Sequence, residues 1–301
     1  MQRQITGILP RIDDPSTVQG CLEMALNSLK TKNMPFMVTS SRTDSGVHAL
    51  SSTCHVDIET DSGNIYEPTF LTAELNKFLL KQDVLIKVVN TFAVPMSFHS
   101  RHSAIARTYL YRFVRIKPHP SISMPLLQHI PIEHSKRTWF STCSDFDENI
   151  MRDAAKLFLG FHDFKTFMGK GSQSSQIDKI TRRFISDIKI EKASSNNYSY
   201  FSIPLHGLNR HAEFEYFNIY IKAPGFLYNQ VRRTVGCIIA AAQGKISVKD
   251  IKFMLEIPSR HSWDTRIKPA PPYGLYLCQV HYRQTDIDTF KEFLQDQDGR
   301  V

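Results

Sequence analysis

Helix-like and strand-like patterns of apolar residues alternate along the chain, and this alternation constrains its fold more than any other feature. Apolar residues at helical spacing predict helices over roughly 16–29, 68–79, 150–158, 226–243 and 247–255. Apolar runs and period-two alternation predict strands at 36–38, 54–59, 84–89, 109–113, 183–190, 198–203, 214–221 and 275–282. Because short loops join most of these elements, the sequence predicts the α+β class.

The length of the chain bears on its domain organisation. At 301 residues it exceeds the usual size of a single core, so two subdomains or one large sheet both fit. We expect an N-terminal α+β half over 1–105 and a C-terminal α+β half over 106–301. Four prolines between 118 and 131 break the regular pattern and mark a connection or an insertion.

A polar loop between two predicted strands, residues 39–49, holds the residues best suited to chemistry. Arg42 and Asp44 lie two positions apart, and Gly46 permits a positive-φ turn that a side chain would resist. Small neighbours would let another molecule approach the backbone. Asp44 is therefore a candidate nucleophile or base, although its spacing alone favours an aspartate that only closes a turn beside Gly46.

Two arginines occupy an unusual place in the predicted helix over 226–243. Arg232 and Arg233 fall in its second turn, among residues that are otherwise apolar. A buried guanidinium is tolerated only when it is paired, so the sequence predicts a partner for at least one of them. Arg233 can instead extend to solvent along its aliphatic stem.

Basic residues also gather beside aromatic ones. Arg101 and Arg107 immediately precede a predicted strand, and Tyr109 at its start is a candidate for stacking on a base. The polar loop 169–176 contains Lys170 and is followed by Arg182, two side chains suited to phosphate contacts. A lone histidine in a turn, His162, is more often structural, and we leave it out of the catalytic set.

Composition favours a polyanionic partner and a soluble chain. Lys and Arg outnumber Asp and Glu by 37 to 29, which gives a net charge of +8. The five cysteines are scattered and form no Cys-x-x-Cys pair, so neither a disulfide framework nor a metal site is predicted. No apolar run approaches the roughly 18 residues that span a bilayer.

Four motifs, met in order along the chain, resemble those of one family. They are SRTDSGVHA (41–49), FHSRHSA followed by RTYLY (98–111), GFHDF (160–164), and FLYNQVRR (226–233) with APPYGLYL (270–277). This order is similar to that of the TruA family of tRNA pseudouridine synthases, with Ser41 and Ser45 in place of the family's usual Gly and Ala. The paired serines before Arg42 and the paired arginines 232–233 resemble most the family's animal pseudouridylate synthase 1-like proteins.

The resemblance implies an activity and a fold. The activity is conversion of uridine to pseudouridine in tRNA, by a homodimer that needs no cofactor and no metal. The expected site is the anticodon stem-loop. The fold would be the pseudouridine synthase fold, with two ferredoxin-like halves that form a central, mostly antiparallel sheet flanked by helices.

The resemblance also implies roles for individual residues. Asp44 matches the catalytic aspartate, a nucleophile or a base, and Arg232 matches the arginine that pairs with it. Tyr109 matches the tyrosine that stacks on the target base and transfers a proton. The residues implied in substrate binding are Arg42, Arg101, Arg107, Tyr109, Lys170, Arg182, Arg233, Leu275 and Leu277, of which the two leucines would form an apolar wall under the uracil.

The start of the chain differs from the family pattern. Family members open with a buried strand and a Tyr-Asp-Gly turn, whereas this sequence opens with Met-Gln-Arg-Gln, so we expect the first strand to be missing. Its absence would remove any targeting peptide as well, and the relatives leave mitochondrion and cytoplasm as the two candidate compartments.

Two other functions compete with this interpretation. A catalytically inactive RNA-binding protein of the same fold is disfavoured by intact Asp44, Tyr109 and Arg232. A metal-dependent RNA hydrolase is disfavoured because no His, Asp or Glu residues have the spacing of metal ligands.

Overall fold

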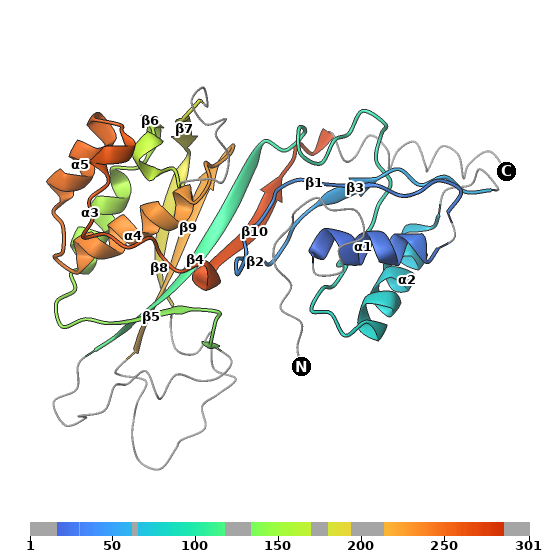
Figure 1. Ribbon diagram of the computed structural model, residues 1–301, viewed down its shortest axis with the longest axis horizontal. Coiled ribbons are helices and arrows are strands. Elements are labelled where there is room, and N and C mark those ends of the chain that lie inside the picture. Colours follow the sequence, from blue (N-terminus) through green and yellow to red (C-terminus); the bar gives the residue numbers. More distant parts are fainter. Residues whose placement is uncertain are drawn as a thin grey trace, which may run out of the picture. The chain divides into compact units, whose positions relative to one another are not determined.

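The computed structural model describes residues 17–29, 31–61, 66–117, 134–169, 180–193 and 214–285. These residues belong to two compact units, one formed by 1–105 with 279–301 and the other by 106–278 (Figure 1). The expected strand at 198–203, the proline-rich segment 118–131 and Lys170 lie outside the described residues.

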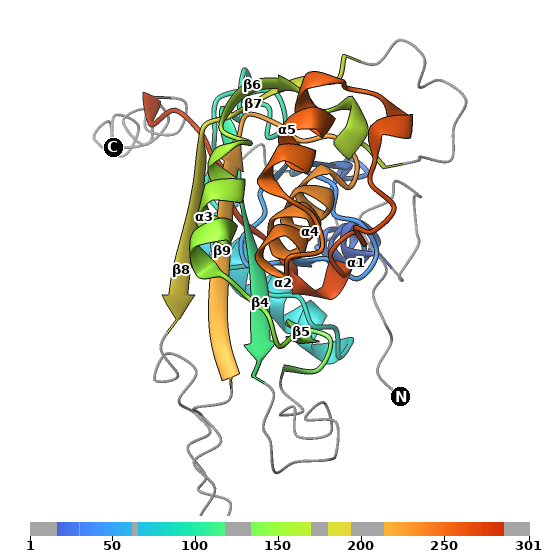
Figure 2. The ribbon, with the colours of Figure 1, turned by 90° about the vertical axis from the view of Figure 1, so that its left-hand side faces the viewer.

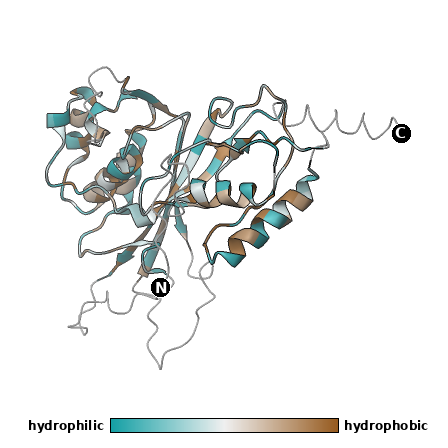
Figure 3. Ribbon diagram, turned by 45° about the vertical axis from the view of Figure 1, so that its right-hand side comes forward, coloured by the Kyte–Doolittle hydropathy of each residue, from teal (hydrophilic) through white to brown (hydrophobic). Residues whose placement is uncertain are grey.

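The residues described up to position 105 of the first unit form two helices and three short strands. In chain order they are α1 (Val18–Asn27), β1 (Met37–Thr39), β2 (His48–Ala49), β3 (Cys54–Val56) and α2 (Pro68–Lys81). Strands β1 and β3 pair antiparallel, with Met37 opposite Val56. Ala25, Leu26 and Leu75 are buried where α1 and α2 pack together. Hydrophobic and hydrophilic residues alternate along the helical ribbons in Figure 3, as expected for helices with one buried face.

Two sequence predictions for this unit need correction. The helix expected over 16–29 spans Val18–Asn27, with Thr17 as its N-cap, whose side chain accepts a hydrogen bond from Gly20 N. The segment 84–89 forms no strand. Its backbone is paired by a side chain instead, because the Asn76 amide on α2 exchanges two hydrogen bonds of 2.8 Å with the backbone of Val88.

The second unit is built on a mostly antiparallel sheet covered by helices. Its strands are β4 (Ala106–Ile116), β5 (Trp139–Thr142), β6 (Gly160–Asp163), β7 (Arg182–Ile185), β8 (Asp187–Ala193), β9 (Phe214–Ala223) and β10 (Leu275–His281). Its helices are α3 (Glu148–Lys156), α4 (Gln230–Ala242) and α5 (Val248–Glu256), with short 3₁₀ turns at Lys165–Phe167, Arg260–Ser262 and Pro272–Gly274.

The main sheet of this unit has the order β10-β4-β9-β8, and β5 runs parallel to β4. Strands β4 and β9 pair antiparallel along their length, from Arg107 opposite Ala223 to Ile116 opposite Phe214. Helices α3, α4 and α5 cover one face of the sheet (Figure 2). The expected α+β class, with a mostly antiparallel sheet flanked by helices, is confirmed.

Aromatic residues of β4 form the centre of this core. Tyr111 and Phe113 are fully buried, and Phe113 stacks on Phe217 of β9. Two residues further along the same strand pair, Glu215 accepts hydrogen bonds from Arg115 and Lys192 at 2.9 and 3.0 Å. Lys117 adds a third ion pair to this carboxylate. The pKa of Glu215 would rise on burial, but hydrogen bonds from Lys192, Lys117 and Arg115 hold it below its ordinary value.

Two predicted elements of the second unit have different boundaries. The strand expected over 183–190 is two strands, because β7 pairs with β6 whereas β8 pairs with β9, and Ser186 between them bonds to Lys222 O. The helix expected from residue 226 begins at Gln230. Asn229 before it has a φ of 59°, a left-handed conformation that a helix cannot continue through.

Candidate active site

The polar loop that carries Asp44 begins at β1, whose backbone is held by side chains of the same unit. Glu23 on α1 accepts a hydrogen bond from Met37 N, and Gln19 donates to Met37 O at 3.1 Å. The buried Ser100 donates to Val38 O at 2.8 Å. These bonds satisfy the edge of a three-residue strand that would otherwise be too short to hold its position.

The loop itself makes a tight turn after Asp44. Val47 N donates to Asp44 O at 3.0 Å, and Gly46 has a φ of 78°. Asp44 is half-buried, whereas Arg42 is exposed. The positive φ predicted at Gly46 is confirmed, and the turn presents a carboxylate on a backbone fixed from both sides.

Two histidines lie near Ser100, the residue that bonds to Val38 of β1. The Nδ1 atom of His55 on β3 accepts from Ser100 N at 3.1 Å, and the His55 ring lies 4.7 Å from that of His99. Burial and the neighbouring His99 lower the pKa of His55, although Asp57 opposes this shift. Neutral His55 is the form that this hydrogen bond requires. Arg101, in the same segment, is exposed.

In the second unit, Arg232 projects from the first turn of α4, one turn earlier than the sequence predicted. Its Nε donates to Ala270 O at 2.7 Å, and its Nη1 donates to Asn229 Oδ1 at 2.9 Å. Both acceptors are neutral oxygens. Neither hydrogen bond therefore balances the positive charge of the guanidinium. The side chain is half-buried and its direction is fixed.

The segment that holds Arg232 is itself clamped to the fold. Ala270 N donates to Arg232 O at 3.0 Å, and the buried Tyr111 hydroxyl donates to Pro271 O at 2.8 Å. A side chain at Gly236 would bring its Cβ within 2.6 Å of Lys268 O, so only glycine permits this approach of the segment to α4. Burial raises the pKa of Tyr111 well above its ordinary value, which keeps the hydroxyl protonated as a donor.

Sequence reasoning missed Asn229, Tyr111 and Ala270 as the residues that orient Arg232. Tyr111 is fully buried, and its hydroxyl also holds Pro271 in place. The motifs at 98–111, 226–233 and 270–277 contain these three positions. These motifs do not indicate which backbone atoms contact each other in the folded chain.

Tyr109 lies on β4 and is half-buried, with its ring edge-to-face against Phe226 at 5.3 Å. Arg107, two residues earlier, donates to Pro224 O at 2.7 Å. Both residues therefore contact the turn that leads into α4. Leu275 and Leu277 begin β10 and are buried, with exposed fractions of 6% and 0%.

Arg233 and Arg182 have different surroundings. Arg233 does not simply extend to solvent: its Nη1 donates to Thr166 O at 2.7 Å, and its guanidinium lies 4.2 Å from the centre of the Trp263 ring. Arg182 on β7 is exposed. The Nε2 atom of His162 donates to Leu159 O at 2.8 Å, a structural contact consistent with its exclusion from the catalytic set.

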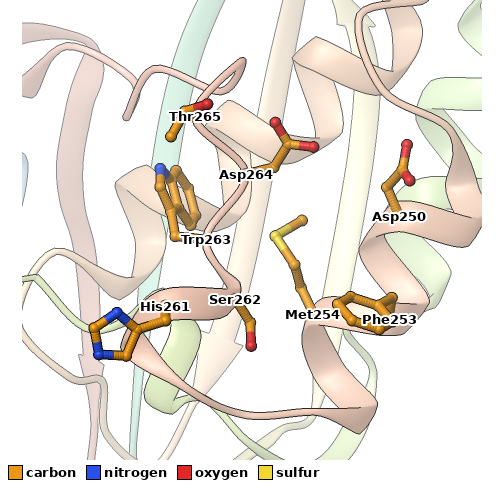
Figure 4. Close-up of a pocket in the computed structure, with 8 residues that line it drawn as sticks. All are labelled: Asp250, Phe253, Met254, His261, Ser262, Trp263, Asp264 and Thr265. Carbon is orange, nitrogen blue, oxygen red and sulfur yellow. The ribbon is translucent and has the colours of Figure 1, made fainter.

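A pocket of about 390 Å³ lies between α5 and the turn that follows it (Figure 4). It is lined by Asp250, Phe253, Met254, His261, Ser262, Trp263, Asp264 and Thr265. Arg266 pairs with both aspartates, at 2.6 Å to Asp264 and 3.3 Å to Asp250. None of the predicted site residues lines this pocket.

Two further observations concern the described residues only. No group of three or more His, Cys, Asp or Glu side chains there is arranged to hold a metal ion. None of the helices in the described ranges combines the length and the apolar character that crossing a bilayer requires.

Comparison with known proteins defines the class of the chain. Residues 154–283 match a family model described as tRNA pseudouridine synthase. Over 274 residues the chain is 31% identical to "tRNA pseudouridine synthase-like 1" of Xenopus laevis, covering 91% of this chain and 85% of that protein. The human protein of the same name is 31% identical over 88% of this chain and 81% of its own length. "tRNA pseudouridine synthase A" of Agrobacterium fabrum is 29% identical over 90% and 86%.

The class is thus an RNA-modifying isomerase on a mostly antiparallel α+β scaffold. The chain belongs to the TruA family of tRNA pseudouridine synthases. The inactive RNA-binding alternative is not favoured by these relatives, and tRNA is the substrate that the family implies.

Proposed function

We propose that Asp44 is the catalytic carboxylate of this synthase, that Arg232 pairs with it, and that Tyr109 stacks on the target uracil. The observation that carries this proposal is the way Arg232 is held. Its Nε and Nη1 atoms are bound by neutral oxygens, so the guanidinium is oriented by its own unit while its charge is left for a carboxylate. An arginine prepared in this way matches the family's partner of the catalytic aspartate.

The chemistry requires one reactive carboxylate and no net hydrolysis. The bond between N1 of uracil and C1′ breaks, the base rotates, and a bond between C5 and C1′ replaces it. The proton on C5 is then lost and N1 gains one. Asp44 acts either as the nucleophile at C1′ or as the base at C2′ that yields a glycal, and Arg232 keeps it ionised in both cases.

Tyr109 and the two leucines are assigned to the base. Tyr109 is half-buried at the start of β4, which suits a ring that is partly covered by protein and partly available to a nucleobase. Its hydroxyl is a candidate for moving the C5 proton. Leu275 and Leu277 would supply an apolar wall. Arg42, exposed in the loop of Asp44, would fill the space left by the flipped nucleotide and offset part of an unstacking cost of about a few kcal/mol.

We further propose that the substrate site is a uridine of the tRNA anticodon stem-loop and that the enzyme acts as a homodimer. RNA would be bound through Arg42, Arg101, Arg107, Lys170, Arg182 and Arg233. The net charge of +8 supports such a surface. Arg233 is the weakest member of this set, since Thr166 and Trp263 already engage it.

The test is pseudouridine formation on unmodified tRNA transcripts labelled with tritium at C5, whose release reports the lost proton. Asp44→Asn should abolish release while fold and RNA affinity are kept, because an amide has the same shape but is neither nucleophile nor base. Asp57→Asn, the same change at an exposed aspartate of the same unit, is the matched control. A wild-type rate for Asp44→Asn would overturn the proposal.

The Arg232→Ala variant should be less stable than the Asp44→Asn variant. It removes the bond to Ala270 O and leaves a carboxylate without its partner, a loss that typically costs about 3 to 5 kcal/mol for a buried pair. Activity should fall in both variants, but the melting temperature only in Arg232→Ala.

A chelator assay in monovalent salt tests the competing function, a metal-dependent RNA hydrolase. EDTA should leave the tritium release unchanged.

A further inference from the structure

The hairpin formed by β6 and β7 carries a pair of phenylalanines that the catalytic proposal does not use. Phe161 and Phe184 are directly opposite each other in the antiparallel register. Residues paired in this way have neighbouring side chains on the same face of a sheet. Figures 1 and 2 show the two strands adjacent beside α5 in both views.

One face of this hairpin is buried and the other is open. Ile185 on the inner face is 1% exposed, whereas Phe161 and Phe184 on the outer face are 66% and 48% exposed. Ile180, just before β7, is 74% exposed. Two neighbouring phenylalanines with this much accessible surface are uncommon on a protein without a partner.

Cations border the outer face. Arg182 follows the same alternation as Phe184 and is exposed, and Lys165 is exposed just beyond β6. One acidic side chain, Asp163, lies opposite Arg182. Its Oδ1 atom is engaged by Thr181 Oγ1 at 2.6 Å and by Lys165 N at 3.0 Å.

We propose that Phe161, Phe184 and Arg182 form a stacking platform for an unpaired nucleotide of the RNA substrate, outside the catalytic centre. The two rings would stack on a base, and the guanidinium would contact the adjoining phosphate. The platform rests on the proposed RNA-binding function and names a further part of the substrate, a single-stranded nucleotide, that the enzyme holds.

Charge complementarity favours RNA over a protein partner. A purely apolar docking face would be covered by another apolar surface, but here the rings lie beside an exposed guanidinium and an exposed ammonium on a chain of net charge +8. Aromatic faces next to cations are the combination that binds unpaired nucleotides.

Binding is tested by fluorescence anisotropy in the Asp44→Asn background, so that turnover does not enter the measurement. Phe161→Ala combined with Phe184→Ala should raise the Kd for a tRNA transcript about 5- to 150-fold, the loss of one base–aromatic stack. Tyrosine at both positions should restore the affinity. Phe253→Ala, at a phenylalanine of α5 that is 54% exposed, is the matched control and should bind as the parent does.

Two additional measurements identify the partner. The double alanine variant should lose nothing on a fully paired RNA duplex, which offers no unpaired base. A Phe161→Trp protein should lose tryptophan fluorescence when tRNA binds, while Phe253→Trp should not. An unchanged Kd for tRNA, an equal loss on the duplex, or conversion of an oligomer into monomers by the alanine changes would each overturn the platform. An active Asp44→Asn protein would instead remove the catalytic proposal and leave this binding result standing.

Discussion

Gly236 provides a sharp test of how the Arg232 guanidinium is oriented. A Cβ atom added there would lie 2.6 Å from Lys268 O and 3.3 Å from Ala270 N, both of them backbone atoms. A carbon and an oxygen cannot approach so closely, so the segment 268–270 must move away from α4 by most of an ångström. That movement would disrupt the two bonds between Arg232 and Ala270.

The cost can be worked out from these contacts. Overpacking typically costs about 1 to 3 kcal/mol. Loss of the charged bond to Ala270 O adds about 1.5 to 3 kcal/mol. Alanine in a helix interior is more stable than glycine by about 1 kcal/mol, which offsets part of this cost. We therefore expect Gly236→Ala to destabilise the second unit by about 1.5 to 5 kcal/mol, or about 3 to 20 °C in Tm for a domain of this size.

Activity should fall as well, by at least about tenfold in kcat, because a displaced Arg232 no longer pairs correctly. The assay combines thermal unfolding with tritium release at saturating tRNA. Gly225→Ala is the control, since a Cβ there would meet no atom within 4 Å. If Gly236→Ala and Gly225→Ala had the same Tm and the same kcat, the clamp around Arg232 would not have the role described.

Three further predictions follow from individual residues. Tyr109→Phe should keep its stacking on the base but lose any proton transfer, so its residual rate in single-turnover assays reports whether the hydroxyl takes part in the chemistry. Glutamate at Lys170 and Arg182 should weaken tRNA binding and reduce its salt dependence without changing the rate on saturating RNA, and filter binding at several salt concentrations would show this. Glu215→Gln should lower stability at pH 7 by about 1 to 2 kcal/mol, as three partly screened ion pairs are lost. Because the folded pKa of Glu215 lies below its unfolded value of about 4.3, this stabilisation is present above that pH and disappears as the pH falls through the folded pKa. The difference in Tm between variant and wild type should accordingly vanish in acid.

Local sequence determined much of the fold. Pro68 at the first position of α2 and the Ser247–Asp250 capping box of α5 act within one turn of helix, and both helices are found where these residues predict them. The alternation likewise identified β9 over most of its length, and for β4 it identified the central residues 109–113 of a longer strand. Short-range signals succeed here because capping and face burial are properties of a single element.

The candidate site was found through ordered motifs rather than through periodicity. Spacing alone left Asp44 as a turn residue, and the roles of Asp44, Tyr109 and Arg232 remain predictions. The surroundings of Arg232 could not be read from the sequence, because they depend on a backbone carbonyl at residue 270. Every residue carries such a carbonyl, so nothing in the side-chain sequence marks this one.

Tertiary structure alone decided the remaining points. Residues 84–89 have the pattern of a strand, yet the Asn76 side chain supplies the hydrogen bonds that a neighbouring strand would provide. The helix expected from Phe226 starts at Gln230 because Asn229 has a φ of 59°, a left-handed conformation through which a helix cannot continue. The hydrophobic pattern indicates which residues are buried. The hydrogen-bond partner of each polar backbone group depends instead on segments that come into contact only in the folded chain.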